Sequence, residues 1–163
     1  MQYSEKSRLK LINHKISKAS IKLLISVGVK YVWCHHGYAY TKLKRKDIPL
    51  HRLLMESLGH NITGLEVDHI NGDSLDNRVT NLRVVTKKQN SFNVRRPTNN
   101  TTGHKGVSFN KKNNNYVAYI GKCPREHLGS FATALLAARA YNGAARKRYG
   151  RFAKLNVLPT NTE

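Results

Sequence analysis

Apolar positions in the first half of the chain fall into two kinds of run. Aromatic and β-branched residues from Val29 to Trp33 and from Gly37 to Leu43 predict two strands, with the hairpin between them passing through Cys34-His35-His36. Residues 5–25 mix Lys with Ile and Leu at loosely helical spacing, which is compatible with a helix. Asp47, followed by Ile48-Pro49, is predicted to open another helix. Its shared apolar face consists of Leu50, Leu53, Leu54 and Leu58.

The last third of the chain predicts three strands and one helix. The strands are expected at residues 105–109, 115–120 and 127–131, joined by turns rich in Asn and Gly. Thr133 is the expected N-cap of the helix, and Gly150 stops it. Small residues and one aromatic repeat at helical spacing and predict a face that packs close to a sheet: Ala134, Ala138, Tyr141 and Ala145.

A polar stretch separates these two regions. Residues 91–103 contain Pro and Gly and show no periodicity, which is typical of a linker. We therefore expect an α+β chain with a module at 1–90, a linker at 91–103, a second module at 104–157 and a tail at 158–163. A length of 163 residues with 39% hydrophobic content favours two modest cores over one large core.

The charge of the chain indicates a polyanionic partner. Lys and Arg number 29 against 9 acidic residues, which gives a formal net charge of +20. Residues 1–67 carry 12 basic and 4 acidic side chains, residues 68–90 carry 4 and 3, and residues 91–163 carry 13 and 2. Acidic lipid is an alternative partner, but no apolar run is long enough to span a bilayer and no helix splits cleanly into basic and apolar faces.

The cysteines favour a reducing, cytoplasmic setting. Cys34 and Cys123 lie far apart and neither belongs to a Cys-x-x-Cys pair, so a disulfide framework or structural zinc site is not expected. Cys34-His35-His36 is the one segment that suggests zinc, and no second ligand pair lies in range. The first ten residues, MQYSEKSRLK, are charged and do not resemble a secretory signal.

The most informative stretch is residues 68–90, DHINGDSLDNRVTNLRVVTKKQN. Asp68 and His69 are adjacent and would point to opposite faces of a strand, so the strand must end or bend there if both are to reach one phosphate. The segment Asn71-Gly72-Asp73 supplies such a bend. Asn81 precedes a short apolar run, and Thr86 can cap a helix that carries Asn90.

This segment resembles the active-site motif of HNH endonucleases, in the variant whose third position is Asn. The resemblance implies a β-hairpin folded over a helix, the ββα-metal arrangement, with one divalent cation between them. Asp68 and Asn90 would hold Mg²⁺ or Mn²⁺ through oxygen ligands. His69 would be the general base, and Asn81 would hold the hairpin in shape through backbone hydrogen bonds. The bland alternative is a set of solvated turns, because Asn77 and Asn81 can also satisfy their own backbone.

Further basic residues are candidates for phosphate contact. The segment His51-Arg52-Leu53 resembles one found just upstream of the motif in phage HNH enzymes, and Arg52 is its candidate for DNA contact. The alternative is that Arg52 packs its stem against the helix and solvates its head. Arg95 and Arg96 in the linker could follow the DNA backbone, or the linker is a solvated tether.

The second module resembles the plant Apetala/ethylene-response-factor DNA-binding domain over about fifty residues. The match lies in Lys105-Gly106-Val107, in residues 127–131 (HLGSF), in residues 137–141 (AARAY) and in residues 150–156 (GRFAKLN). In that family a three-stranded sheet enters the major groove. Here the sheet has fewer Arg and Trp residues, so the base code does not carry over. Lys111, Lys112 and Arg125 are candidates for phosphate contact, and Asn110 and Tyr119 for base or sugar contact.

These observations predict a site-specific DNA endonuclease of the homing type. A phage or mobile-intron origin is implied by the resemblance to HNH endonucleases alone. The enzyme would act as a monomer on double-stranded DNA in the cytoplasm of a bacterial host, with a metal ion and no small-molecule cofactor. The alternative is a non-catalytic DNA-binding protein or transcription regulator in which the HNH fold is degenerate. RNA binding ranks third, because the aromatic stacking motifs of RNA modules are not visible in the sequence.

Overall fold

The computed structural model describes residues 15–93, 100–122 and 124–159. The chain forms two compact units, Met1–Asn90 and Ser91–Glu163, and each is considered on its own. None of the helices in the described residues is long and apolar enough to cross a membrane.

The N-terminal unit begins with a helix and a three-stranded antiparallel sheet. Helix α2 (Lys18–Ser26) follows Ser17, whose side chain caps it by accepting from the amide of Ser20. The strands β1 (Val32–His35), β2 (Tyr38–Leu43) and β3 (Lys46–Pro49) lie in the order β1-β2-β3.

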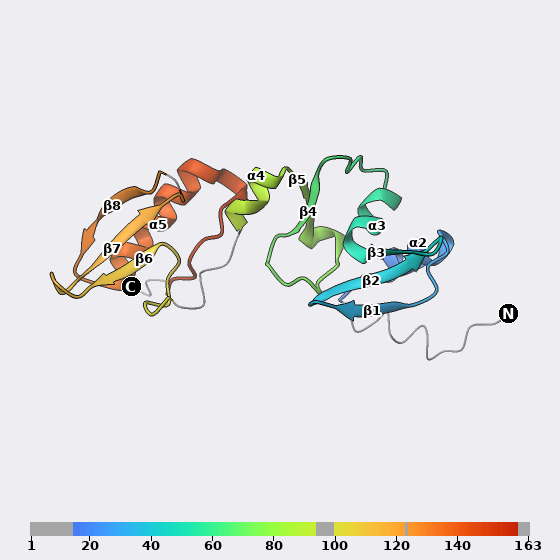
Figure 1. Cartoon of the computed structure of the whole chain (residues 1–163), viewed down its shortest axis with the longest axis horizontal. Helices are drawn as coiled ribbons and strands as arrows, with labels where there is room; N and C mark the ends of the chain where they lie inside the picture. The colour runs from blue at the N-terminus through green and yellow to red at the C-terminus, as the bar shows by residue number, and fades with distance from the viewer. Residues whose placement is uncertain (1–14, 94–99, 123, 160–163) are drawn as a thin grey trace. The chain divides into compact units, whose positions relative to one another are not determined.

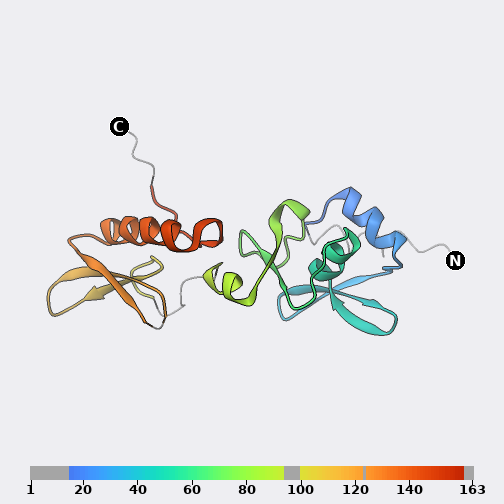
Figure 2. The same cartoon turned by 90° about the horizontal axis from the view of Figure 1, so that it is seen from above.

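Helix α3 (Leu50–Ser57) follows β3 directly, and α2 and α3 lie on the same side of the sheet (Figures 1 and 2). The apolar side chains between helices and sheet form the core of the unit, and those with no exposed surface are Leu24, Ala39, Leu50 and Leu54. Burying such side chains is the main favourable term that holds the helices against the sheet.

The structure differs from the prediction in how this sheet is built. Strand β1 runs through Cys34 and His35, and the turn falls at His36-Gly37. Asp47 lies inside β3, which was not predicted, so it does not open α3. The turn between β2 and β3 is Lys44-Arg45, and both residues have positive φ angles of 48° and 66°. A two-residue turn of this kind normally uses Asn or Gly, so the sequence carried no signal for the hairpin.

The observed bounds of the two N-terminal helices also differ from the predicted bounds. Of the helix predicted within residues 5–25, the structure contains α2, which begins at Lys18 and ends at Ser26, and residues 1–14 lie outside the described range. In α3, the residues Leu50, Leu53 and Leu54 are buried as predicted. Leu58 is the C-cap and is exposed, because the helix ends before it can turn that side chain toward the core.

The second half of the unit is a hairpin followed by a short helix. Strands β4 (Glu66–His69) and β5 (Leu82–Val85) pair antiparallel, and a long loop joins them that ends in the short 3₁₀ helix η1 (Val79–Asn81). Helix α4 (Lys87–Asn90) follows β5. The Thr86 hydroxyl accepts from the amide of Gln89 and the Gln89 side chain accepts from the amide of Thr86, a reciprocal capping box that fixes where α4 begins.

The C-terminal unit confirms the predicted strands and helix. After the 3₁₀ helix η2 (Ser91–Asn93) come β6 (Val107–Asn110), β7 (Asn115–Ile120) and β8 (Glu126–Phe131), which form an antiparallel sheet in that order. Helix α5 (Ala134–Tyr149) covers one face of this sheet (Figure 1). Its N-cap is Thr133, whose hydroxyl accepts from the amide of Leu136.

Small side chains bring α5 close to the sheet. Ala137, Ala138 and Ala145 have no exposed surface, and Tyr141 is buried between them, as its predicted core role required. Gly106 meets the ring of Tyr141 at the start of β6. A Cβ added there would lie 2.1 Å from Tyr141 Cδ2 and 2.7 Å from the carbonyl oxygen of Tyr119.

The chain then returns from α5 and the 3₁₀ helix η3 (Gly150–Phe152) to the start of the unit. Asn156 accepts from the amide of Lys105 at 2.6 Å and donates to the carbonyl of Lys105 at 3.0 Å. Asn142 of α5 makes a matching pair of bonds to the backbone of Asn156. These bonds join the two ends of the unit.

The Gly106 contact makes a prediction about stability. Gly106→Ala should lower the free energy of unfolding of the C-terminal unit by about 3 kcal/mol, because the new Cβ overlaps the Tyr141 ring and φ is positive. Gly103→Ala is the matched control, because Gly103 also has a positive φ but has nothing within 4 Å of its Cβ position. It should cost about 1 kcal/mol. Urea unfolding followed by circular dichroism measures both, and equal costs would contradict the close packing.

Candidate active site

Strand β4 presents the two central motif residues on opposite faces. Its last residue, His69, pairs with Leu82 of β5, and Asp68 pairs with Arg83. The chain turns immediately afterwards, where the amide of Gly72 donates to the carbonyl of His69 at 2.8 Å and Gly72 has a φ of 76°. The strand therefore ends directly after His69, as the sequence predicted, and Asp68 and His69 are its last two residues.

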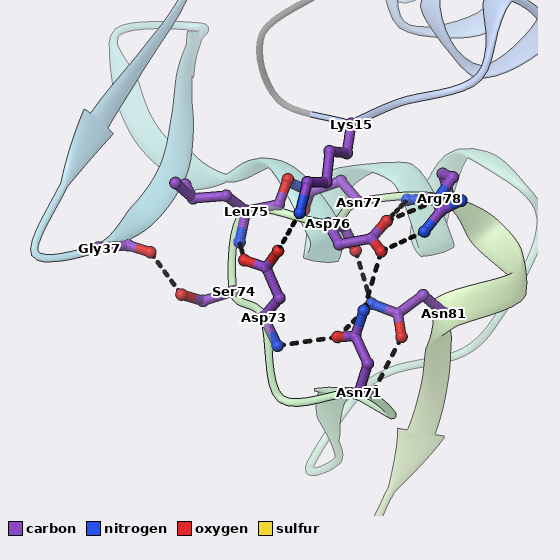
Figure 3. A network of polar contacts seen from close by, with 10 residues as sticks. All are labelled: Lys15, Gly37, Asn71, Asp73, Ser74, Leu75, Asp76, Asn77, Arg78 and Asn81. Carbon is purple, nitrogen blue, oxygen red and sulfur yellow. Dashed lines mark hydrogen bonds and ion pairs between the residues drawn. The ribbon is translucent and has the colours of Figure 1, made fainter.

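Asn81 fastens the loop that follows β4 (Figure 3). Its Oδ1 accepts from the amide of Asn71 at 3.0 Å, and its Nδ2 donates to the Asn71 side chain at 3.0 Å and to the carbonyl of Asp76 at 2.8 Å. Asn81 is buried, so each of these bonds satisfies a group that has little access to water. One side chain thus binds both the start and the middle of the loop.

Charged pairs complete the loop (Figure 3). Arg78 binds both carboxylate oxygens of the buried Asp76, and this bond is the main cause that lowers the pKa of Asp76 to about 2. Lys15 contacts Asp73 at 2.6 Å, and the hydroxyl of Ser74 donates to the carbonyl of Gly37. The Gly37 bond attaches the tip of the β1–β2 hairpin to the loop beside His69.

His69 is buried on one face of β4 beside Asn77. The Nδ2 of Asn77 donates to the carbonyl of Leu75 at 3.1 Å, so its Oδ1 faces Nε2 of His69 at 3.5 Å. An acceptor at this position favours the tautomer with its proton on Nε2. Burial lowers the pKa of His69, and the Asn77 contact and Asp68 oppose that shift. The imidazole is therefore neutral at neutral pH, which is the form that can accept a proton.

A second histidine packs against the first. The ring of His51 from α3 lies 5.0 Å from that of His69, and Tyr38 from β2 lies 5.8 Å from His51 and 6.2 Å from His69. His51 is 8% exposed, and its buried Nδ1 has no hydrogen-bond partner. Burial is the main cause that lowers its pKa to about 3, with smaller contributions from His69 and Arg52. His51 was not among the predicted site residues, although its spacing from Leu54 and Met55 places it on the buried face of α3.

The other face of β4 carries carboxylates. Glu66 and Asp68 share this face because they are two residues apart in a strand. Arg83 donates twice to Asp68 Oδ2, at 2.9 and 2.7 Å, across the strand pair. The side-chain amide of Asn90 in α4 donates to Glu66, so Asn90 lies over this face with Asp68. Glu66 and Arg83 were not among the predicted site residues, since their roles depend on strand register.

Asp68 and Asn90 carry the kinds of oxygen atom that a hard divalent cation binds. Asp68 offers a carboxylate and Asn90 an amide oxygen, and Mg²⁺ or Mn²⁺ binds such oxygens while keeping several waters. The bond from the Asn90 amide nitrogen to Glu66 fixes which end of that side chain is the oxygen. In the described residues, no group of three or more His, Cys, Asp and Glu side chains is placed to hold a metal ion. A site here would therefore depend on two protein oxygens with water and phosphate.

The remaining candidates for DNA contact occupy different places. Arg52 donates to the carbonyl of Leu65 at 3.1 Å, so part of its guanidinium is used within the unit. Arg95 and Arg96 lie outside the described residues.

In the C-terminal unit the five candidates form two groups. Arg125 lies over the ring of Tyr119 at 4.2 Å, and His127 lies 5.2 Å from the same ring. Lys111 and Lys112 are exposed in the β6–β7 turn, where Asn110 accepts from the amide of Lys112. His127 was missed by the sequence analysis, because only the strand pairing brings it beside Tyr119.

Comparison with known proteins decides the family. A family model described as HNH endonuclease matches residues 49–92, a range that contains Asp68, His69, Asn81 and Asn90. Protein 3.8 of Escherichia phage T7 is 30% identical over 91 residues, which cover 56% of this chain and 75% of that protein. The chain belongs to the HNH endonuclease family.

Two further relatives carry the family name. An uncharacterized HNH endonuclease of Acanthamoeba polyphaga mimivirus is 34% identical over 130 residues, which cover 76% of this chain and 57% of that protein. A candidate HNH homing endonuclease of the SPbeta prophage of Bacillus subtilis is 29% identical over 85 residues, 52% of this chain and 47% of that protein. The chain thus spans about half the length of these two relatives. No solved structure matches it.

The buried histidine of this HNH chain makes a prediction about pH. Because His51 has a lower pKa folded than unfolded, the unfolded state binds more protons between pH 6.5 and about 3, and stability falls as pH falls through that window. The loss from His51 between pH 7 and pH 5 is about 2 kcal/mol. His51→Phe keeps a ring and removes the titrating group. Between pH 7 and pH 5 the unfolding free energy of this variant should therefore fall by about 2 kcal/mol less than that of the wild type. His60→Phe changes an exposed histidine and is the control. Equal pH dependence in wild type and His51→Phe would show that His51 is not buried in the neutral form.

Proposed function

We propose that this HNH chain is a metal-dependent DNA endonuclease of the homing type. The observation that carries the proposal is the C-terminal end of β4. The last two residues of this strand are Asp68 and the buried, neutral His69, and they lie beside a loop that Asn81 holds through hydrogen bonds. The relatives from a phage, a virus and a prophage support the mobile origin.

The proposed chemistry is hydrolysis of a phosphodiester bond in double-stranded DNA. His69 takes a proton from water as its oxygen adds to phosphorus and the bond to the 3′ oxygen breaks. Asn77 holds the ring of His69, and the packed ring of His51 limits its rotation. Asp68 and Asn90 are the proposed ligands of one Mg²⁺ or Mn²⁺ within a ββα-metal arrangement of β4, β5 and α4. The cation, when bound, supplies positive charge at the phosphate and the leaving oxygen.

One observation favours a second candidate function. Arg83 already neutralises Asp68 through two hydrogen bonds, and a carboxylate paired in this way is satisfied without a cation. A chain in which this pair persisted would bind DNA without cutting it, as a degenerate HNH protein or transcription regulator. Under the nuclease proposal Arg83 instead leaves Asp68, or shares it, when metal and phosphate bind.

The C-terminal unit is proposed to target the nuclease. Its helix lies on one face of the sheet. Tyr119 of β7, His127 of β8 and Arg125, which precedes β8, cluster away from the helix core. The order of strands and helix supports the resemblance to an Apetala/ethylene-response-factor domain, while the family match ends at residue 92. A second tethered contact would raise the local concentration of the nuclease at one site.

Cleavage of supercoiled plasmid tests the nuclease proposal. Wild type should nick or linearise plasmid only with Mg²⁺ or Mn²⁺, and Asp68→Ala and His69→Ala should each lower the rate at least about 100-fold. The reason is that one change removes a metal ligand and the other the base.

The matched controls are Asp47→Ala and His60→Ala, which remove an exposed carboxylate and an exposed imidazole from the same unit and should leave the rate unchanged. The DNA affinity of His69→Ala, measured by gel shift, should stay within about threefold of the wild-type affinity, because His69 is proposed to accept a proton and not to hold the DNA. Tight DNA binding by wild type without metal-dependent cutting would favour the non-catalytic function.

The salt dependence of DNA binding tests the role of the C-terminal sheet. Arg125→Ala should weaken binding to a duplex of arbitrary sequence and reduce the slope of log affinity against log salt by about 1, the loss of one phosphate contact. Arg146→Ala removes an exposed charge from α5 instead and should leave the slope unchanged. Equal effects of the two variants would mean that the sheet does not contact DNA.

A further inference from the structure

The N-terminal sheet carries a row of aromatic rings on the face away from its helices. Tyr31 and Trp33 lie 5.7 Å apart between ring centroids, Trp33 and Tyr40 lie 6.3 Å apart, and Tyr40 and His35 lie 5.8 Å apart. Trp33 pairs with Tyr40 across β1 and β2, and His35 pairs with Tyr38. The row is therefore continuous over two strands.

These rings take no part in the core. The cluster of buried apolar side chains in the unit comes from the opposite face, where Val32, Ala39 and Thr41 point toward α2 and α3. Tyr31 is 45% exposed, and Trp33, the single tryptophan of the chain, is only half-buried. Large rings left on a surface in a contiguous group are typical of a binding surface rather than of chance exposure.

The row leads to the proposed catalytic histidine. Tyr38 pairs with His35 across the hairpin, and its ring lies 5.8 Å from that of His51 and 6.2 Å from that of His69. The hydroxyl of Ser74 holds the hairpin tip against the active-site loop through the carbonyl of Gly37, as Figure 3 shows. A nucleotide chain whose phosphate lies at His69 would therefore have its neighbouring nucleotides beside these rings.

The charged residues around the row of aromatic rings indicate which kind of partner this face binds. Lys42 shares the outward face with Tyr40, Lys30 precedes Tyr31, and the β2–β3 turn adds Lys44 and Arg45. Asp47, which contacts Lys42 at 3.4 Å, is the acidic residue of this sheet. A second copy of a chain with a net charge of +20 would be repelled from such a surface, whereas a phosphate backbone would be attracted. Exposed rings among basic residues suit unpaired bases, which offer a free face for stacking.

We infer that the outward face of the β1–β2 hairpin, formed by Tyr31, Trp33, His35, Tyr38 and Tyr40, binds unpaired nucleotides of the DNA strand next to the scissile phosphate. The inference rests on the proposed nuclease function for its biological role. It adds a binding site for single-stranded DNA that lies outside residues 68–90, and it implies that the duplex opens beside the cut.

Trp33 is a built-in reporter for this site. The full-length protein is titrated with an oligothymidine of about ten nucleotides in the presence of chelator, so that no cleavage takes place. Trp33 emission should change saturably, and a duplex of the same length should bind less tightly at this site. Tyr31→Ala should weaken the binding that Trp33 reports about tenfold, because one stacking ring is lost. Tyr31→Phe should restore it, because the ring is present again.

Leu58→Ala is the matched control, since Leu58 is 44% exposed in the same unit but lies outside the row. Its affinity should equal that of wild type. An unchanged Trp33 signal with oligothymidine, or equal effects of Tyr31→Ala and Leu58→Ala, would overturn the inference. So would a wild-type protein that sediments as a dimer and a Tyr31→Ala variant that does not, because the face would then bind a second copy.

The outcome is separable from that of the plasmid assay. Cutting without a Trp33 response would leave the nuclease proposal intact and remove the stacking site. A Trp33 response without cutting would leave a single-strand binding surface on a non-catalytic chain. Circular dichroism of each variant checks that the substitutions, all on exposed side chains, leave the fold unchanged.

Discussion

A set of buried polar bonds determines the shape of the candidate active site. The loop between β4 and β5 places Asp76, Asn77 and Asn81 out of water, where an unsatisfied polar group costs about 1–3 kcal/mol. Each of these side chains is bonded within the loop, and Asn81 alone binds the backbone or side chain of two separate turns. A loop held by apolar contacts would tolerate sliding. A loop held by directional bonds has one arrangement, and His69 takes its position from it.

The two-residue period of a strand divides the chemistry of this site between two faces. His69 packs with His51, Asn77 and Tyr38, whereas Asp68 faces Arg83 and α4. The division puts His69 where burial lowers the pKa of its imidazole, and it puts the adjacent Asp68 beside the guanidinium of Arg83.

The structural elements that were predicted correctly are those marked by a local sequence signal, such as a cap or a turn residue. Thr133 and Gly150 marked both ends of α5, and the strands of the C-terminal unit followed from short runs between Asn- and Gly-rich turns. The bend after His69 was likewise visible in Asn71-Gly72-Asp73. Strand β3 was missed because Lys44-Arg45 adopts a turn that such residues rarely adopt. The pairs Asp68 with Arg83 and His51 with His69 depend on register and on packing between distant segments, which no local pattern contains. The metal ligands and the DNA contacts stay predictions.

The bonds between Lys105 and Asn156 have an implication for how such chains arise. They close a loop of some fifty residues and bring the entrance and exit of the C-terminal unit side by side. A unit whose ends meet can be joined to another protein at a single surface point, and the join need not disturb either core. Recombination could therefore move this sheet and helix between enzymes as one portable part.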